Sequence, residues 1–148
     1  MDKIPSFQKD HNKLMPGLYM SVAKNGIATF DLRFKRPNEG DYIAQAALHS
    51  IEHMLATILR NGEHKEDIVY FGPMGCRTGF YLLTTNMGYG ETLAMLKNAF
   101  ADSLRMEEVP GALKNECGNY LEHDLAGAKK ECAAYLALLE TLGEKENG

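Results

Sequence analysis

The sequence lacks tryptophan, has no long apolar run and shows no concentration of basic residues. Its 148 residues carry 16 Lys and Arg against 20 Asp and Glu, for a formal net charge of −4. The basic residues are scattered, which argues against nucleic acid or an anionic membrane as a partner. No apolar run reaches about 18 residues, the length needed to cross a membrane, and the amino-terminal residues do not resemble a signal peptide. We therefore expect a cytoplasmic protein.

Cysteine is also scarce, with only Cys76, Cys117 and Cys132. An odd number of cysteines in a chain without an export signal favours reactive or metal-bound thiols over disulfides. Cys132 shares a helical stripe with apolar residues such as Leu125 and Leu139, which predicts packing in the core. We assign it no chemical role.

The amino-terminal third of the chain has the pattern of a β-hairpin. Two apolar segments between Leu18 and Phe34 flank Asn25-Gly26, a pair that tolerates the positive φ angles of a tight turn. Apolar and polar residues alternate in the second segment. This alternation predicts that Arg33 projects away from the apolar face.

The remaining sequence predicts two more strands and three helices. Apolar residues recur at helical spacing over about 41–60, 93–104 and 125–142, while aromatic and branched residues predict strands over about 68–71 and 78–85. Asp124 is placed to cap the last helix. The short links favour antiparallel pairing. We therefore predict an α+β two-layer sandwich, with a mainly antiparallel four-stranded sheet, helices packed on one face and a single domain over residues 1–148.

The strongest chemical signal is His49-Ser50-Ile51-Glu52-His53, inside the first predicted helix. Residues four apart lie one turn above each other, so both imidazoles can bind one ion while Glu52 stays nearby. The same His-x-x-Glu-His arrangement occurs in inverted zinc peptidases, where the glutamate is a base rather than a ligand. The alternative is a helix whose histidines face solvent or fill the edge of the core.

A metal that performs chemistry usually takes three protein ligands and keeps one position open. Cys117 is the leading candidate for the third ligand, because it lies in a non-helical stretch where a thiolate can reach an ion. Glu131 is the rival, since inverted zinc peptidases draw a glutamate from a later helix. His123 could lie near Cys117 but most simply belongs to the entry of the last helix, so we leave it outside the predicted site.

Two further residues are chemical candidates with an inert alternative. Cys76 is flanked by Gly75 and Arg77, a setting in which the backbone can approach closely and a cation can favour the thiolate. Free cysteine is, however, also among the most buried residue types. His11 stands in a polar amino-terminal segment, where a solvated side chain is the default.

Taken together, these motifs resemble one family, S-ribosylhomocysteine lyase, the bacterial enzyme that makes the precursor of the autoinducer-2 signal. The resemblance covers nearly the whole chain, and each motif gains weight from its place in the order. The matching segments are Ser6-Phe7 with Asp10-His11, Phe30–Phe34 with Pro37-Asn38, His49–His53, Pro73–Gly79, Cys117–Tyr120 and Gly127–Lys129. The sequence departs from the family pattern at Val69–Gly72.

The resemblance implies a metal-dependent carbon–sulfur lyase. Such an enzyme cleaves the thioether of S-ribosylhomocysteine to homocysteine and 4,5-dihydroxy-2,3-pentanedione by carbonyl migration and β-elimination. It implies one divalent metal per subunit, typically Fe²⁺ that Zn²⁺ or Co²⁺ can replace. The implied metal ligands are His49, His53 and Cys117.

The resemblance also assigns the remaining site residues. It implies that Cys76 and Glu52 form the catalytic pair. The implied substrate-binding residues are Ser6, His11 and Arg33. In this family the site forms where the two subunits of a homodimer meet, so a homodimer is expected here.

Two other classes of protein remain open from the sequence. A small peptidase-like metallohydrolase would use Glu52 to activate a metal-bound water and Glu131 in place of Cys117, but it explains Cys76 poorly. A metal-dependent structural module would normally need four protein ligands, and the sequence offers three good ones.

Overall fold

The computed structural model describes residues 1–22 and 24–143, without the side chains of residues 5, 6, 22 and 24. Its strands are β1 (Gly17–Val22), β2 (Ile27–Arg33), β3 (Ile68–Pro73) and β4 (Gly79–Thr85). Its longer helices are α2 (Gln45–Arg60), α3 (Tyr89–Ser103) and α4 (Leu125–Glu140), and its short ones are α1 (Pro5–Gln8), η1 (Lys24–Gly26) and η2 (Lys65–Asp67). These elements form the predicted α+β fold.

The four strands make one antiparallel sheet in the order β1-β2-β4-β3. The predicted hairpin of β1 and β2 is confirmed, and its turn uses positive φ angles of 69° at Asn25 and 76° at Gly26. At the other end of β2, a side chain on Gly79 would meet the backbone carbonyl of Leu32. Glycine there lets β4 approach β2 closely, just after the segment that holds Cys76.

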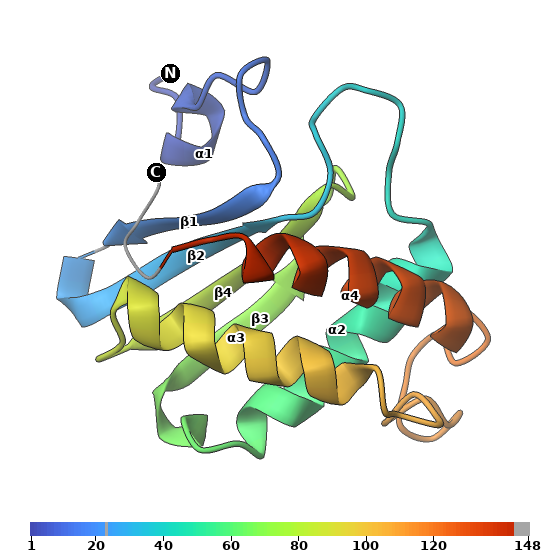
Figure 1. Cartoon of the computed structure of the whole chain (residues 1–148). Coiled ribbons are helices and arrows are strands. Elements are labelled where there is room, and N and C mark those ends of the chain that lie inside the picture. Colours follow the sequence, from blue (N-terminus) through green and yellow to red (C-terminus); the bar gives the residue numbers. More distant parts are fainter. Residues whose placement is uncertain (23, 144–148) are drawn as a thin grey trace.

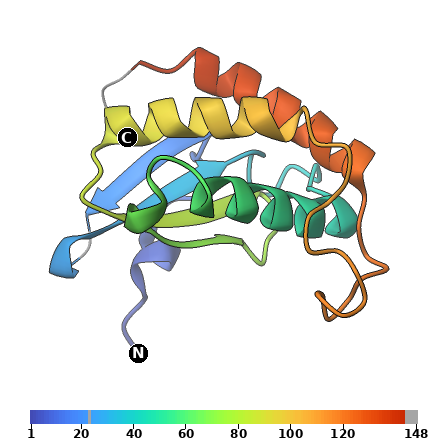
Figure 2. The same ribbon diagram turned by 90° about the horizontal axis from the view of Figure 1, so that it is seen from below.

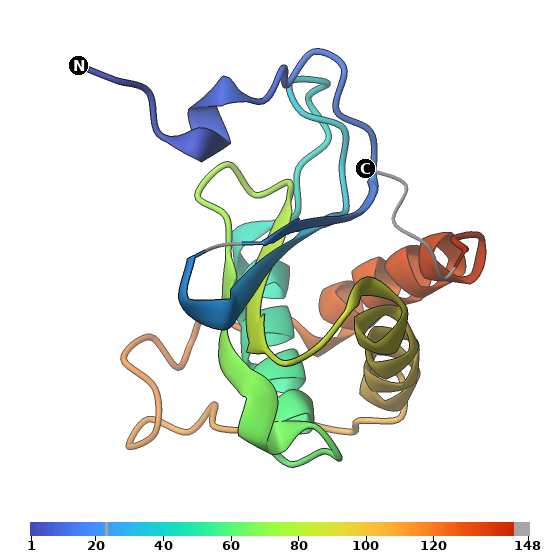
Figure 3. The same cartoon turned by 90° about the vertical axis from the view of Figure 1, so that its left-hand side faces the viewer.

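The three longer helices cover one face of the sheet, as predicted (Figure 1). In the view from below, α3 and α4 lie above the sheet while α1 hangs beneath it (Figure 2). The side view also separates them, with α3 and α4 to one side of the sheet and the amino-terminal segment to the other (Figure 3). None of the helices in the described part of the chain combines the length and the apolar character needed to cross a membrane.

The core lies between the sheet and the helices. Its fully buried side chains include Phe30, Leu32, Phe80, Leu82, Ile51, Met54, Leu55, Leu96 and Phe100. Phe34, the residue after β2, stacks on Tyr135 of α4 at 4.2 Å between ring centroids. The Tyr135 hydroxyl also donates to the Gly17 carbonyl at 2.9 Å, which attaches α4 to β1.

Cys132 is completely buried in α4, as its helical stripe predicted. Burial raises the pKa of the Cys132 thiol to about 12. The thiol is therefore protonated and shielded at neutral pH, which fits a packing role.

The predicted helix boundaries shift where tertiary contacts compete with helical bonds. The first predicted helix begins at Gln45 rather than at 41, because the Ile43 N–H donates to the Arg77 carbonyl at 3.0 Å. The second runs from Tyr89 to Ser103 and so extends beyond the first residue of its apolar pattern, Leu93, while the third ends at Glu140 rather than at about 142. The cap prediction is confirmed, since the Asp124 side chain accepts from the Gly127 N–H at 2.9 Å. The sequence analysis missed α1.

A buried threonine in β4 provides a stability test. The hydroxyl of Thr84 is fully buried and has no hydrogen-bond partner among the described residues. Since an unpaired buried hydroxyl carries a desolvation cost, Thr84→Val should raise the free energy of unfolding by about 1 kcal/mol in urea titration. The control is Thr85→Val, which removes a bond to Asp67 Oδ1 and should not stabilise. A Thr84→Val protein less stable than the parent would contradict this account.

Candidate metal centre

Two histidines on α2 face the segment that joins α3 to α4. His49 and His53 are both half-buried and lie one helical turn apart. His49 Nδ1 bonds the Glu122 carbonyl at 2.8 Å, and His53 Nδ1 bonds the Pro110 carbonyl at 2.9 Å. A carbonyl can only accept, so each imidazole carries its proton on Nδ1. Each Nε2 is therefore left with a free lone pair.

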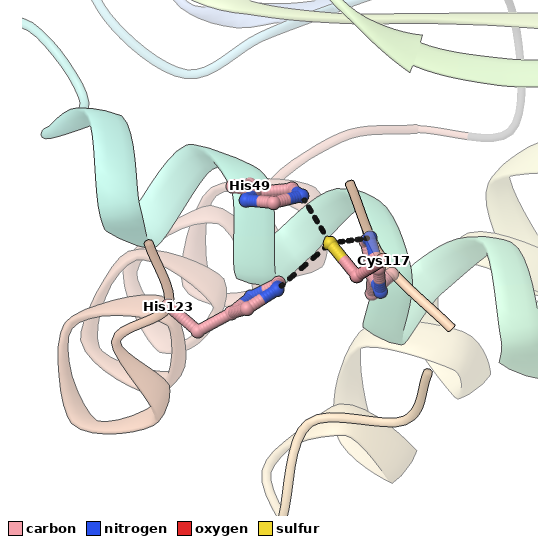
Figure 4. A group of neighbouring side chains, drawn as sticks. His49, Cys117 and His123 are labelled. Carbon is pink, nitrogen blue, oxygen red and sulfur yellow. Dashed lines mark hydrogen bonds between the residues drawn. The ribbon is translucent and has the colours of Figure 1, made fainter. Parts of the chain in front are cut away.

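The sulfur of Cys117 lies between these rings. Its Sγ is 3.5 Å from His49 Nε2 and 3.9 Å from His53 Nε2. The Asn119 N–H points at the same sulfur at 3.4 Å, a contact that suits a thiolate. The loop after α3 thus brings a sulfur ligand to the two nitrogen ligands predicted on α2 (Figure 4).

The structure adds His123, which the sequence analysis left outside the site. His123 Nε2 lies 3.7 Å from Cys117 Sγ, and the four ligand atoms are all within 4.8 Å of one another. Ser50 on α2 positions this residue, because its Oγ contacts His123 Nδ1 at 3.1 Å and accepts from the Asp124 N–H at 2.8 Å. The sequence signal that could have indicated His123 was its position six residues after Cys117 in a non-helical stretch.

The charge state of His123 also suits a ligand. Burial lowers the pKa of His123, and the nearby imidazoles of His49 and His53 lower it further. A neutral imidazole is the form that binds a metal. One cysteine sulfur and three imidazoles, each imidazole with its second nitrogen already bonded, match the ligand chemistry of zinc and of ferrous iron. The residues present therefore fit a divalent metal.

The two glutamates of the sequence analysis have different surroundings. Glu131, the rival ligand, accepts from Lys35 Nζ at 3.0 Å and is not among the clustered ligand residues. Nothing in the described part of the chain supports the peptidase alternative that needed it. Glu52 is half-buried beside His53 in sequence, and it takes part in none of the hydrogen bonds or ion pairs found among the described residues.

A separate cavity of about 460 Å³ surrounds Cys76. His11, Arg33, Thr78 and Tyr81 are among its lining residues. The structure thus brings Cys76, His11 and Arg33 together. Neither Glu52 nor any residue of the candidate metal site lines this cavity. The side chain of Ser6 lies outside the described part of the chain.

Arg33 is much less accessible than a typical binding arginine. Its side chain is only 2% exposed, although it lies on the face of β2 away from the core, as predicted. Its Nε and Nη2 donate to the two carboxylate oxygens of Asp31, and its Nη1 donates to Thr78. The described bonds use three of its five N–H groups, which leaves two for a ligand in the cavity.

The fold and these two features define a class: a small α+β protein with a candidate metal site and a separate cavity lined by a cysteine. Comparison with known proteins is more specific. The family profile described as S-Ribosylhomocysteinase (LuxS) matches residues 4–146. The chain therefore belongs to the S-ribosylhomocysteinase (LuxS) family.

Individual relatives match over almost their full length. The chain is 47% identical to the S-ribosylhomocysteine lyase of Borreliella afzelii, covering 98% of this chain and 97% of the relative. It is 46% identical to that of Phocaeicola vulgatus, over 92% and 89% of the two chains. For the Finegoldia magna protein of the same name, identity is 40% over 99% and 97%.

The ligand assignment can be tested by metal analysis of purified variants. Cys117→Ala should lose the metal, because it removes the sulfur that lies between the imidazoles. Glu131→Gln should retain it, since that carboxylate is paired with Lys35 instead. A Cys117→Ala protein with full metal content would refute the assignment.

Proposed function

We propose that this protein is an S-ribosylhomocysteine lyase, which cleaves the thioether of S-ribosylhomocysteine into homocysteine and 4,5-dihydroxy-2,3-pentanedione, the precursor of the autoinducer-2 signal. Membership of the family over residues 4–146 supports this reaction. The observation that carries the proposal is the cluster of four possible metal-ligand atoms, two on α2 and two on the segment between α3 and α4. Repeated enolisation of a sugar needs an electrophile that stabilises the developing negative charge on oxygen. A metal held by these atoms would supply it.

The proposed ligands of the metal are His49, His53 and Cys117, with His123 as a further donor within reach of the same ion. Fe²⁺ is the proposed native metal, one per subunit, and Zn²⁺ or Co²⁺ would suit the same mixed sulfur and nitrogen set. When bound, the metal supplies Lewis-acid stabilisation of the negative charge that develops on a sugar oxygen.

Cys76 is the proposed proton carrier. As a thiolate it takes a proton from one sugar carbon and returns it to the next, which moves the carbonyl from C1 toward C3. With the carbonyl at C3, the sulfur on C5 is a β leaving group. A base removes the C4 proton, the C4–C5 double bond forms, and the C5–S bond breaks so that homocysteine leaves with the electron pair. The enol that remains tautomerises to 4,5-dihydroxy-2,3-pentanedione.

Glu52 is the proposed second base. A carboxylate without a described partner is free to exchange protons with substrate hydroxyls and to assist the elimination. Substrate contacts are proposed for His11, Arg33 and Ser6. His11 and Arg33 line the cavity of Cys76, which supports this role for them.

A homodimer with its sites at the subunit interface is part of the proposal. Within one chain, Cys76 lines a cavity that includes neither Glu52 nor the metal ligands, although the reaction needs all of them around one substrate. The cavity is bordered by the exposed apolar side chains of Phe7 and Tyr42, which a second subunit would cover. The three free thiols suit the reducing environment of a cytoplasm.

The proposed reaction can be tested by assaying homocysteine release from S-ribosylhomocysteine. The metal-loaded protein should release the thiol, and removal of the metal by a chelator should stop it. Cys76→Ala and Glu52→Gln should each slow release by at least roughly 10²-fold while metal content stays normal, as expected for lost acid–base catalysts. Failure of the loaded parent protein to release homocysteine would overturn the proposed function.

The shared site predicts complementation between inactive variants. Each site should take Cys76 from one subunit and Glu52 from the other, so a mixed dimer of Cys76→Ala and Glu52→Gln subunits would hold one intact site. Random exchange of equal amounts should restore about a quarter of parental activity, because half of the dimers are mixed and each has one of its two sites intact. Mixing Cys76→Ala with Cys76→Ser subunits is the control and should restore none. Persistent inactivity despite demonstrated subunit exchange would place both residues in one chain's site.

A further inference from the structure

Thr78 is a buried residue between Arg33 and Cys76, and the function described above gives it no role. Its side chain is 1% exposed. Thr78 Oγ1 lies 2.7 Å from Arg33 Nη1 and 3.0 Å from Cys76 Sγ. The cysteine itself is exposed to the cavity, so the threonine lies behind the sulfur.

The chemistry of the three groups determines the direction of these bonds. A guanidinium group only donates, so Thr78 Oγ1 accepts from Arg33. The hydroxyl proton of Thr78 then remains for a second partner. A thiolate only accepts, so when Cys76 is ionised its contact with Thr78 must be O–H···S⁻. The cationic donor on the oxygen also polarises this hydroxyl and strengthens the bond it donates.

Both neighbours of the hydroxyl are held in place. Arg33 is locked by two bonds to Asp31, from Nε to Oδ1 at 3.1 Å and from Nη2 to Oδ2 at 2.6 Å. The Thr78 carbonyl accepts the N–H groups of Phe34 and Lys35 at 2.8 and 2.9 Å. These bonds hold the backbone of Thr78, and its side chain cannot turn away without losing the bond from Arg33.

The other groups around Cys76 do not replace this donor. Asp31 offsets the charge of Arg33 and is itself paired with Lys9 at 3.2 Å. Burial and the Asp31 charge raise the pKa of Tyr81, and its phenol makes no hydrogen bond to the Cys76 sulfur among the described contacts. His11 Nδ1 bonds the Lys9 carbonyl, and Arg77 donates to the Ile43 carbonyl and lies 5.7 Å from the Tyr42 ring centroid.

We propose that Thr78 is a positioning residue that donates its hydroxyl proton to the Cys76 sulfur and so favours the thiolate, with Arg33 setting the direction of the bond. The proposal rests on the proposed function only in giving the thiolate its use as a proton carrier. The bond itself belongs to the resting protein and can be measured without turnover.

The test is the pH dependence of Cys76 alkylation by iodoacetamide in the metal-loaded protein, followed by mass spectrometry of the peptide that contains Cys76. Removing a hydrogen bond to a charged sulfur should move the midpoint of this profile upward by about one to two pH units in Thr78→Val. Thr78→Ser keeps the hydroxyl and should stay close to the parent. An unchanged midpoint in a folded Thr78→Val protein would overturn the proposal, as would an equal shift in Thr78→Ser.

Thr84→Val is the matched control, because it makes the same substitution in β4 at a hydroxyl outside this network. It should leave the alkylation midpoint unchanged. A shift of the same size in this control would show a general effect of packing and would overturn the assignment to Thr78.

A measurement on the parent protein covers the case in which Thr78→Val does not fold. The ¹³C-labelled methyl resonance of Thr78 should titrate with the same midpoint as Cys76 alkylation, and Cys76→Ser should abolish that titration. A Thr78 resonance that stays constant while Cys76 ionises would refute the hydrogen bond. Since neither experiment uses S-ribosylhomocysteine, a protein that passes both but releases no homocysteine would refute only the lyase proposal.

Discussion

The candidate metal site depends above all on the packing of α2. One face of this helix buries Ile51, Met54 and Leu55 completely, and it contacts β3, α3 and α4. The same helix presents His49 and His53 to the segment between α3 and α4. Because the apolar face fixes the rotation and height of α2, the positions of the two imidazoles follow from the core.

The segment after α3 has little regular structure, yet it is held at several points by α2. The carbonyls of Pro110 and Glu122 accept from the two histidines, and Ser50 contacts the residues that open α4. The bonds to the two carbonyls hold Nδ1 of each histidine and direct its Nε2 toward Cys117 Sγ. The side chains of the candidate metal site are therefore oriented by the folded chain itself.

The cysteine cavity depends on a different kind of contact. Arg33 and Asp31 form a buried ion pair, an arrangement that by itself adds little to stability once the cost of desolvation is counted. Its effect here is geometric, because it presents a guanidinium N–H to Thr78 in a fixed direction. The Ile43–Arg77 bonds then attach the cysteine loop to the chain just before α2. The cysteine cavity is thus attached to the chain at Ile43, a few residues before His49 of the candidate metal site.

The sequence by itself determined the features that arise between near neighbours. The positive-φ pair Asn25-Gly26 specified the hairpin, the side chain of Asp124 capped α4, and a spacing of four residues put His49 and His53 on one side of α2. Each depends on backbone preference or helical geometry within a few residues. The order of motifs along the chain was enough to identify the family.

Only the tertiary structure decided which distant residues meet. The sheet order β1-β2-β4-β3, the late start of α2 and the approach of His123 to Cys117 all come from contacts between segments far apart in sequence. The local sequence around His123 offers only its six-residue spacing from Cys117, whereas its position beside that sulfur depends on Ser50, 73 residues away. The burial of Arg33 beside Thr78 likewise follows from the pairing of β2 with β4. Such pairings are selected by the packing of the whole core, which periodicity along the chain does not encode.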